Sequence, residues 1–173
     1  MTVRPIRVVG DPVLRTPCDP IRTVTDGTRT LVRDLLDTVD DPARAGVAAN
    51  QIGIGQRAFS WHLVETGELG YILNPVIVEL SEELQHDDEG CLSVPGLFFP
   101  RTRSAFARCV GTDLEGEEIE LAGEGIIARL IQHEVGHLDG ELYIDGLERS
   151  VKKRALRQIR ETQIGRASCR ERV

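Results

Sequence analysis

The pentapeptide His133-Glu134-Val135-Gly136-His137 carries the clearest chemical signal in the chain. Histidines four positions apart lie about one turn apart on the same face of a helix, so both imidazoles can reach one metal ion. Glu134 is angularly offset from them, which keeps its carboxylate off the ion and free to handle the proton of a water molecule. Two surface histidines on a solvated helix are the alternative, but the apolar residues around the motif disfavour it.

Two histidines leave a metal site incomplete, and Cys91 is the strongest candidate for the third ligand. It lies in Glu89-Gly90-Cys91-Leu92-Ser93-Val94-Pro95, which we expect to be a short irregular segment that can bring a thiolate to a metal. His62, His86 and the carboxylates remain open as ligands. Taken alone, Cys91 would more simply be a small buried apolar residue, and this is our interpretation of the remaining cysteines, Cys18, Cys109 and Cys169.

A third segment, Gly46-Val47-Ala48-Ala49-Asn50-Gln51, begins with small residues and ends at Gln51, whose side chain is an amide. Small residues let a second backbone approach closely, and Gln51 offers an N–H donor to a carbonyl oxygen. A glycine–alanine turn between a helix and a strand explains the same segment without any function, so the segment alone decides nothing.

Hydrophobic periodicity indicates the elements that must position these residues. It predicts amphipathic helices over 26–40, 123–138 and 150–164, and strands over 58–64, 71–80, 105–112 and 117–121. Four prolines break the segment Val3–Pro20, which predicts an extended arm rather than a helix. Strands that precede the motif helix favour an α+β domain.

Length and composition limit the class of protein. A chain of 173 residues is one domain's worth, and 40% hydrophobic with 28% charged residues is ordinary for a globular protein. No stretch approaches the ~20 apolar residues of a membrane span, the N-terminus lacks the apolar run of a signal peptide, and the cysteine spacing does not indicate a disulfide framework. We therefore expect a soluble, cytoplasmic, single-domain protein with no membrane partner.

The net charge of −7 hides an asymmetry between an acidic body and a basic end. Residues 1–148 hold 12 Lys/Arg against 26 Asp/Glu, a net of −14, whereas residues 149–173 hold 9 against 2, a net of +7. The acidic body excludes a protein that coats nucleic acid with its whole surface.

Taken together, the three segments resemble the motifs of the peptide deformylase family, whose members remove the N-formyl group from new bacterial polypeptides. They occur in the family's order as 46–51, 89–93 and Gln132-His133-Glu134-x-x-His137-Leu138. The resemblance extends from about Val8 to near Ile164 and implies small, mostly antiparallel sheets packed around a central metal-binding helix, plus a C-terminal helix. Residues 165–173 do not fit the family, and we interpret them as an end that a vector or a frameshift added.

The resemblance also implies a role for each residue of the motifs. Cys91, His133 and His137 would hold one divalent metal ion, Fe(II) natively, with Zn or Ni able to replace it. Glu134 would act as base and then acid, while Gln51 and the backbone N–H of Leu92 would donate to the formyl oxygen.

The substrate is expected to be the formyl-Met N-terminus of a nascent chain, bound as an extended strand near Gly46. Its Met side chain would enter a pocket formed by Val47, Ile126, Leu130 and Arg129. Glu89 and Arg101 would form a polar network behind the metal ligands. In deformylases the C-terminal helix is associated with ribosome docking, so the basic helix here is expected to contact ribosomal RNA, with a merely solvated face as the alternative.

The sequence departs from the family at four positions. The family usually has Gly where this chain has Arg44, Asp where it has Gly136, and apolar residues in place of Arg129 and Asp87. Two alternatives stay open: a His-Glu-x-x-His metallopeptidase, and a deformylase-like protein that binds N-termini with weak or no turnover.

Overall fold

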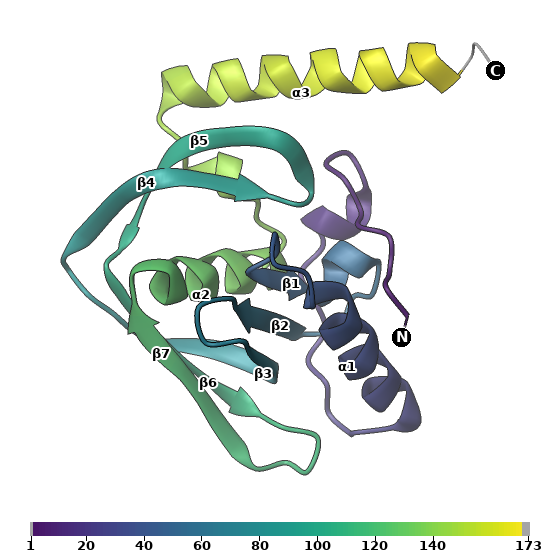
Figure 1. Cartoon of the computed structure of the whole chain (residues 1–173), viewed down its shortest axis with the longest axis vertical. Helices are drawn as coiled ribbons and strands as arrows, with labels where there is room; N and C mark the ends of the chain where they lie inside the picture. Colours follow the sequence, from purple (N-terminus) through teal and green to yellow (C-terminus); the bar gives the residue numbers. More distant parts are fainter. Residues whose placement is uncertain (1, 171–173) are drawn as a thin grey trace.

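Five antiparallel strands and a separate two-stranded ribbon surround one central helix in the computed structural model, which describes the backbone of residues 2–170 and the side chains of residues 2–162 (Figure 1). The sheet runs in the order β1-β2-β3-β6-β7, which leaves β1 at one edge. Its strands are β1 (Gly46–Ala48), β2 (Ala58–Leu63), β3 (Glu68–Leu80), β6 (Phe106–Thr112) and β7 (Glu118–Glu124). The ribbon pairs β4 (Leu84–Cys91) with β5 (Val94–Ser104).

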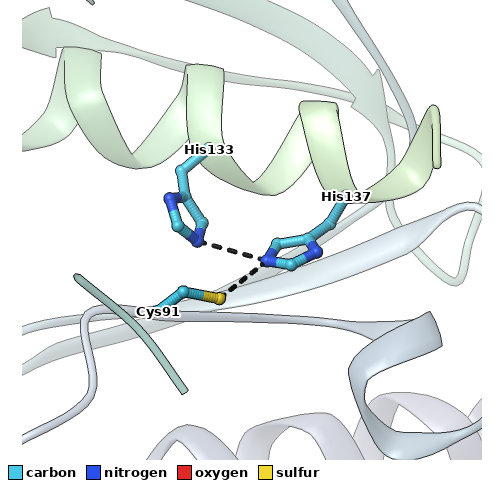
Figure 2. Close-up of side chains that lie close together, drawn as sticks. All are labelled: Cys91, His133 and His137. Carbon is cyan, nitrogen blue, oxygen red and sulfur yellow. Dashed lines mark hydrogen bonds between the residues drawn. The ribbon is translucent and has the colours of Figure 1, made fainter. Parts of the chain in front are cut away.

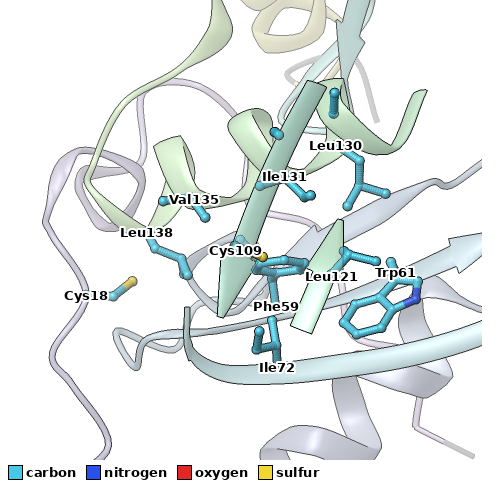
Figure 3. Packing of buried hydrophobic residues seen from close by; sticks show 13 residues of the cluster. Cys18, Phe59, Trp61, Ile72, Cys109, Leu121, Leu130, Ile131, Val135 and Leu138 are labelled. Atoms are coloured by element: carbon cyan, nitrogen blue, oxygen red, sulfur yellow. The ribbon is translucent and has the colours of Figure 1, made fainter. Parts of the chain in front are cut away.

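The central helix α2 (Gly125–Leu138) packs one face on the sheet. Its apolar residues recur at helical spacing and meet the inward side chains of β2, β3, β6 and β7 in a continuous core (Figure 3). Ile131 and Leu138 are fully buried against it, as is Phe59 of β2. Each such side chain contributes about 1.5–3 kcal/mol on leaving water, so α2 is held in place by packing rather than by helix propensity.

The helix α1 (Asp26–Val39) covers the other side of β1 and β2. Thr25 caps its N-terminus through a reciprocal pair of hydrogen bonds with Thr28. The helix ends at Val39, just before Asp41-Pro42, as the sequence predicts. Leu31, Leu35 and Val39 are buried and form a second core.

A third core lies beneath the ribbon and the last helix, α3 (Arg149–Arg170). Among the described side chains of α3, Ala155 and Ile159 are buried, and the guanidinium of Arg154 lies 5.6 Å from the centre of the Phe99 ring of β5. Figure 1 shows α3 running across the ribbon at the top of the molecule. No helix in the described part of the chain is long and apolar enough to cross a membrane.

The α+β fold and the predicted helices and strands are confirmed, with three corrections. The segment around Cys91 is not a loop, because β4 and β5 form a ribbon that the sequence did not predict, although its pairing shifts register between Gly90 and Cys91. The arm contains one 3-10 turn at Pro12–Arg15, which Asp11 caps. The backbone of α3 continues past residue 164 to Arg170; the side chains of the predicted added end, 165–173, and all of 171–173 lie outside the described residues.

Candidate metal centre and substrate cavity

Three ligating side chains converge at the face of α2 that is turned away from the sheet (Figure 2). Nε2 of His137 lies 3.2 Å from Nε2 of His133 and 3.2 Å from Sγ of Cys91, and all three ligand atoms lie within 4.8 Å of one another. The helix supplies the two histidines one turn apart, as their spacing predicts. His62 of β2 and His86 of β4, the other histidines, do not join this group.

Cys91 reaches the histidines because the ribbon is irregular at its end. The pairing of β4 and β5 shifts register between Gly90 and Cys91, which re-aims the side chain that follows. The backbone N–H of Ser93 donates to Sγ at 3.4 Å, and Nε2 of Gln51 lies 3.6 Å from it. These two donors hold Sγ in place on the side that faces the histidines.

The outer ring nitrogen of His133 is fixed by Glu89, whose Oε1 lies 2.7 Å from Nδ1. Burial alone would lower the pKa of His133, but Cys91 and Glu89 outweigh it and raise that pKa well above its ordinary value. Burial and the neighbouring His133 lower the pKa of His137 instead. One sulfur and two imidazole nitrogens that face one another in this way fit a divalent cation that accepts N and S ligands, such as Zn²⁺ or Fe²⁺.

Glu89 is a buried carboxylate with three cationic neighbours. Arg103 donates two hydrogen bonds to it, of 3.0 and 2.6 Å, and Nη1 of Arg129 donates a third, of 2.9 Å. Burial would raise the pKa of Glu89, but His133 and Arg103 hold it well below its usual range. Glu89 is therefore charged and holds the ribbon on α2.

The prediction that Arg101 contacts Glu89 is wrong, because Arg103 takes that place. Residues 99, 101 and 103 lie on one face of β5, so strand alternation allows either arginine. Nη1 of Arg101 donates instead to the backbone oxygen of Gly146.

Glu134 lies beside the metal-binding group and is 4% exposed. Its Oε2 has no hydrogen-bond partner among the described residues, and Cγ, Cδ and Oε1 press against Gly46, where an added Cβ would lie 2.6 Å from Oε1. Burial raises the pKa of Glu134 to about 7, a shift that His133 only partly offsets. A carboxyl group in this state can both take and give a proton near neutral pH.

A cavity of about 380 Å³ opens in front of this group. Gly46, Gln51 and Leu92 line it together with Cys91, His133 and Glu134. Three predicted pocket residues, Ile126, Arg129 and Leu130, line it as well. Val47 does not line it: alternation along β1 turns Val47 into the core beneath α1, where it is fully buried.

Three supporting residues were missed at the sequence level. Arg103 holds Glu89, Ser93 accepts a hydrogen bond of 3.1 Å from Nε2 of Gln51, and Asn50 donates to the backbone oxygen of His137. Asn50 lies in the motif 46–51 and Ser93 in the motif 89–93, so their place in these motifs could have identified them. Cys18 and Cys109 are buried, as predicted, and burial raises the pKa of each to about 11.

A Cys-His-His metal-binding group with a buried carboxylate beside it, on an α+β scaffold, defines a metallohydrolase. Residues 3–153 match the model of the polypeptide deformylase family. The chain therefore belongs to the peptide deformylase family, and it is an enzyme that removes the formyl group from N-terminal formylmethionine. Both alternatives raised by the sequence, a metallopeptidase and a non-catalytic binding protein, are thereby set aside.

Individual relatives agree with the family match. The chain is 44% identical over 163 residues to the peptide deformylase of Parafrankia sp., covering 94% of this chain and 88% of the relative. It is 45% identical to that of Acidothermus cellulolyticus, with 94% and 89% covered. The crystal structure of a peptide deformylase from Legionella pneumophila superposes with a TM-score of 0.87 at 32% identity, covering 96% and 98% of the two chains.

Proposed function

We propose that Cys91, His133 and His137 hold one divalent metal ion, Fe(II) in the cell, with Zn or Ni able to occupy the same site. The observation that carries this proposal is the convergence of the three ligand atoms within 4.8 Å of one another beside the buried carboxyl of Glu134. Once bound, such an ion supplies a Lewis acid for the formyl carbonyl and lowers the pKa of water.

Glu134 is the proton carrier of the reaction in this proposal. Its carboxylate takes a proton from the attacking water and returns it to the nitrogen of the leaving amine. The contact with Gly46 and the burial of Glu134 support this role, because they hold the carboxyl in one place and keep its pKa near neutrality.

Gln51 and Leu92 stabilise the negative charge that develops on the formyl oxygen. Oε1 of Gln51 accepts a hydrogen bond of 2.9 Å from the backbone N–H of Ala48, which turns Nε2 toward Ser93 and Cys91 at the edge of the metal-binding group. The backbone N–H of Leu92 is the second donor, and Leu92 lines the same cavity. Donors placed in advance at such an oxygen are worth about 2.7–4 kcal/mol each.

The substrate binds in this proposal as an extended strand on the outer edge of β1. Among the described strands only β2 pairs with β1, so one edge is open beside Gly46. The methionine side chain enters the cavity at Ile126, Leu130 and Arg129, and Gly46 lets the substrate backbone approach.

We also propose that the enzyme is cytoplasmic and contacts the ribosome through α3. With Ala155 and Ile159 buried, the arginines at 154, 157 and 160 and Lys153 lie on its exposed side, whereas Lys152 is in part tied to the body by a hydrogen bond of 3.1 Å to the backbone of Asp145. Neutralising all five basic residues should abolish co-sedimentation with ribosomes. Unchanged co-sedimentation would show that the basic side of α3 is only solvated and does not bind the ribosome.

Formate release from a formyl-Met peptide tests the catalytic proposal. Protein prepared anaerobically and loaded with metal should release formate, and Glu134→Ala should lose most of this activity while keeping its metal. Cys91→Ser should lose metal. Equal rates for Glu134→Ala and wild type, or undiminished metal in Cys91→Ser, would contradict the assigned roles.

A further inference from the structure

A second cavity of about 380 Å³ lies behind the metal centre. His133 lines both this cavity and the substrate cavity, so its imidazole lies between them. We call the second one the arginine cavity, because three arginines line it: Arg15 of the N-terminal arm, and Arg101 and Arg103 of β5. Nothing in the proposed reaction uses it.

One of the three arginines of the arginine cavity has no carboxylate within ion-pair distance. Arg15 pairs with Asp145, and Arg103 pairs with Glu89. No described carboxylate lies within ion-pair distance of Arg101, and the one hydrogen bond of its guanidinium to the described residues goes to the uncharged backbone oxygen of Gly146. Burial and the nearby Arg103 lower the pKa of Arg101, and the charges of Glu89 and Glu141, which lie beyond ion-pair distance, only partly offset this.

Gly136 of α2 lines the cavity but places no side chain in it. A Cβ added there would meet only the Cβ of Glu141, at 4.0 Å, so no side chain fills the space between α2 and the segment that follows it. At Gly146 the opposite holds: an added Cβ would lie 2.1 Å from Nη2 of Arg101, so the guanidinium lies directly on this glycine. The backbone therefore fixes Arg101 while the room beside Gly136 stays open.

We propose that the arginine cavity binds a small carboxylate monoanion beside Arg101. A guanidinium presents parallel N–H donors that match the two oxygens of a carboxylate. A single charge is favoured because only one arginine lacks a partner, and because Asp145 and Glu141 also line the cavity and repel a dianion. Formate, which deformylation releases on the other side of His133, belongs to this chemical class; that link rests on the proposed function, but the binding does not.

The test measures anion binding directly, without turnover. Metal-loaded full-length protein is titrated calorimetrically with sodium formate and sodium acetate, with sodium sulfate at equal ionic strength as the dianion arm. Wild type should bind formate and acetate saturably and more tightly than sulfate. Arg101→Gln should weaken the binding about tenfold or more, because a hydrogen bond between charged partners is lost. Arg33→Gln, which removes the same charge from the exposed face of α1, should bind as wild type does.

Two further variants keep the proposal testable if Arg101→Gln does not fold. Gly136→Asp places a carboxylate of the chain itself into the cavity and should abolish the binding of added formate. Glu141→Gln removes a competing carboxylate and should tighten it. The absence of saturable formate binding to wild type, or unchanged affinity in Arg101→Gln and Gly136→Asp, would overturn the proposal. Because formate release is assayed separately, failure of this site and failure of the deformylase mechanism give different results.

Discussion

Oε1 of Glu89 lies 2.7 Å from Nδ1 of His133, so a carboxylate of the ribbon orients a histidine of the central helix. A carboxylate that accepts from Nδ1 fixes the orientation of the imidazole, so that Nε2 is the nitrogen offered to a metal, and Nε2 faces Cys91 and His137. Arg103 and Arg129 hold the carboxylate from its other sides. The ligand geometry of this deformylase therefore depends on a residue that need not touch the metal.

Replacing Glu89 by Gln should weaken metal binding by about 10–100-fold, because the amide holds the imidazole less strongly and leaves two guanidinium groups without their anion. Competition with a chelator, measured well below the unfolding temperature, gives the affinity. Glu82→Gln makes the same change at an exposed position and should leave the affinity unchanged. Equal affinities for Glu89→Gln and wild type would show that Glu89 does not position His133.

Gly46→Ala should reduce kcat/KM by about 10–100-fold while the protein retains its metal. The added Cβ would lie 2.6 Å from Oε1 of Glu134, so this carboxyl group must move, and small displacements of a proton carrier are costly. Gly55→Ala is the matched control, because a Cβ there meets nothing within 4 Å. Steady-state kinetics and metal analysis on both variants provide the check; a fully active Gly46→Ala enzyme would argue against a fixed Glu134.

Arg129→Met should lower the free energy of unfolding by about 1.5–3 kcal/mol. The guanidinium donates to Glu89 and to the backbone oxygen of Arg101 and is only 6% exposed, so the substitution removes a charge-assisted hydrogen bond from a buried site. Urea unfolding of the metal-loaded protein measures the change. Arg33→Met, on the exposed face of α1, should change the stability by less than about 0.5 kcal/mol. Similar losses in both variants would mean that the burial of Arg129 is unimportant.

Asp145→Asn should destabilise the protein at neutral pH but not in acid. Burial would raise the pKa of Asp145, but the hydrogen bond and charge of Arg15 and the backbone N–H of Leu142 hold that pKa below its ordinary value. The resulting stability is complete above the unfolded-state pKa of about 3.9 and disappears as the pH falls through the lower folded-state pKa.

The expected loss for Asp145→Asn at pH 7 is about 0.5–1 kcal/mol, since solvent screens this partly exposed pair. Unfolding in urea at pH 7 and at successively lower pH should show the difference from wild type shrinking below about pH 4. A difference that does not depend on pH would assign the effect to packing rather than to charge.

Helical periodicity was the most reliable guide to the fold. It located α1 and α2 because each buries one stripe of apolar residues, including Leu35 and Ile131. The ribbon was missed because β4 carries polar residues on both faces over Gln85–Asp88, so it lacks the alternation that marks a half-buried strand.

The metal-binding group was predictable because its spacing and neighbouring motifs identify the ligands, and the structure brings Cys91, His133 and His137 together. The surroundings were less predictable. Strand alternation alone could not predict whether Arg101 or Arg103 contacts Glu89. The outcome depends on Gly146, far along the chain, whose backbone oxygen accepts a hydrogen bond from the guanidinium of Arg101. Val47 was misplaced because the three-residue strand β1 turns alternate side chains to opposite faces.

The open edge of β1 has a consequence for when the enzyme can act. A strand can be added there only by a segment whose backbone N–H and C=O groups are unpaired, and a nascent N-terminus that has entered a helix or hairpin no longer offers them. Helices form in about 0.1–1 μs and hairpins in about 1–10 μs once enough chain is available. In the proposed binding mode, deformylation at this edge competes with the folding of its own substrate, and N-termini that stay extended longest are expected to be processed most completely.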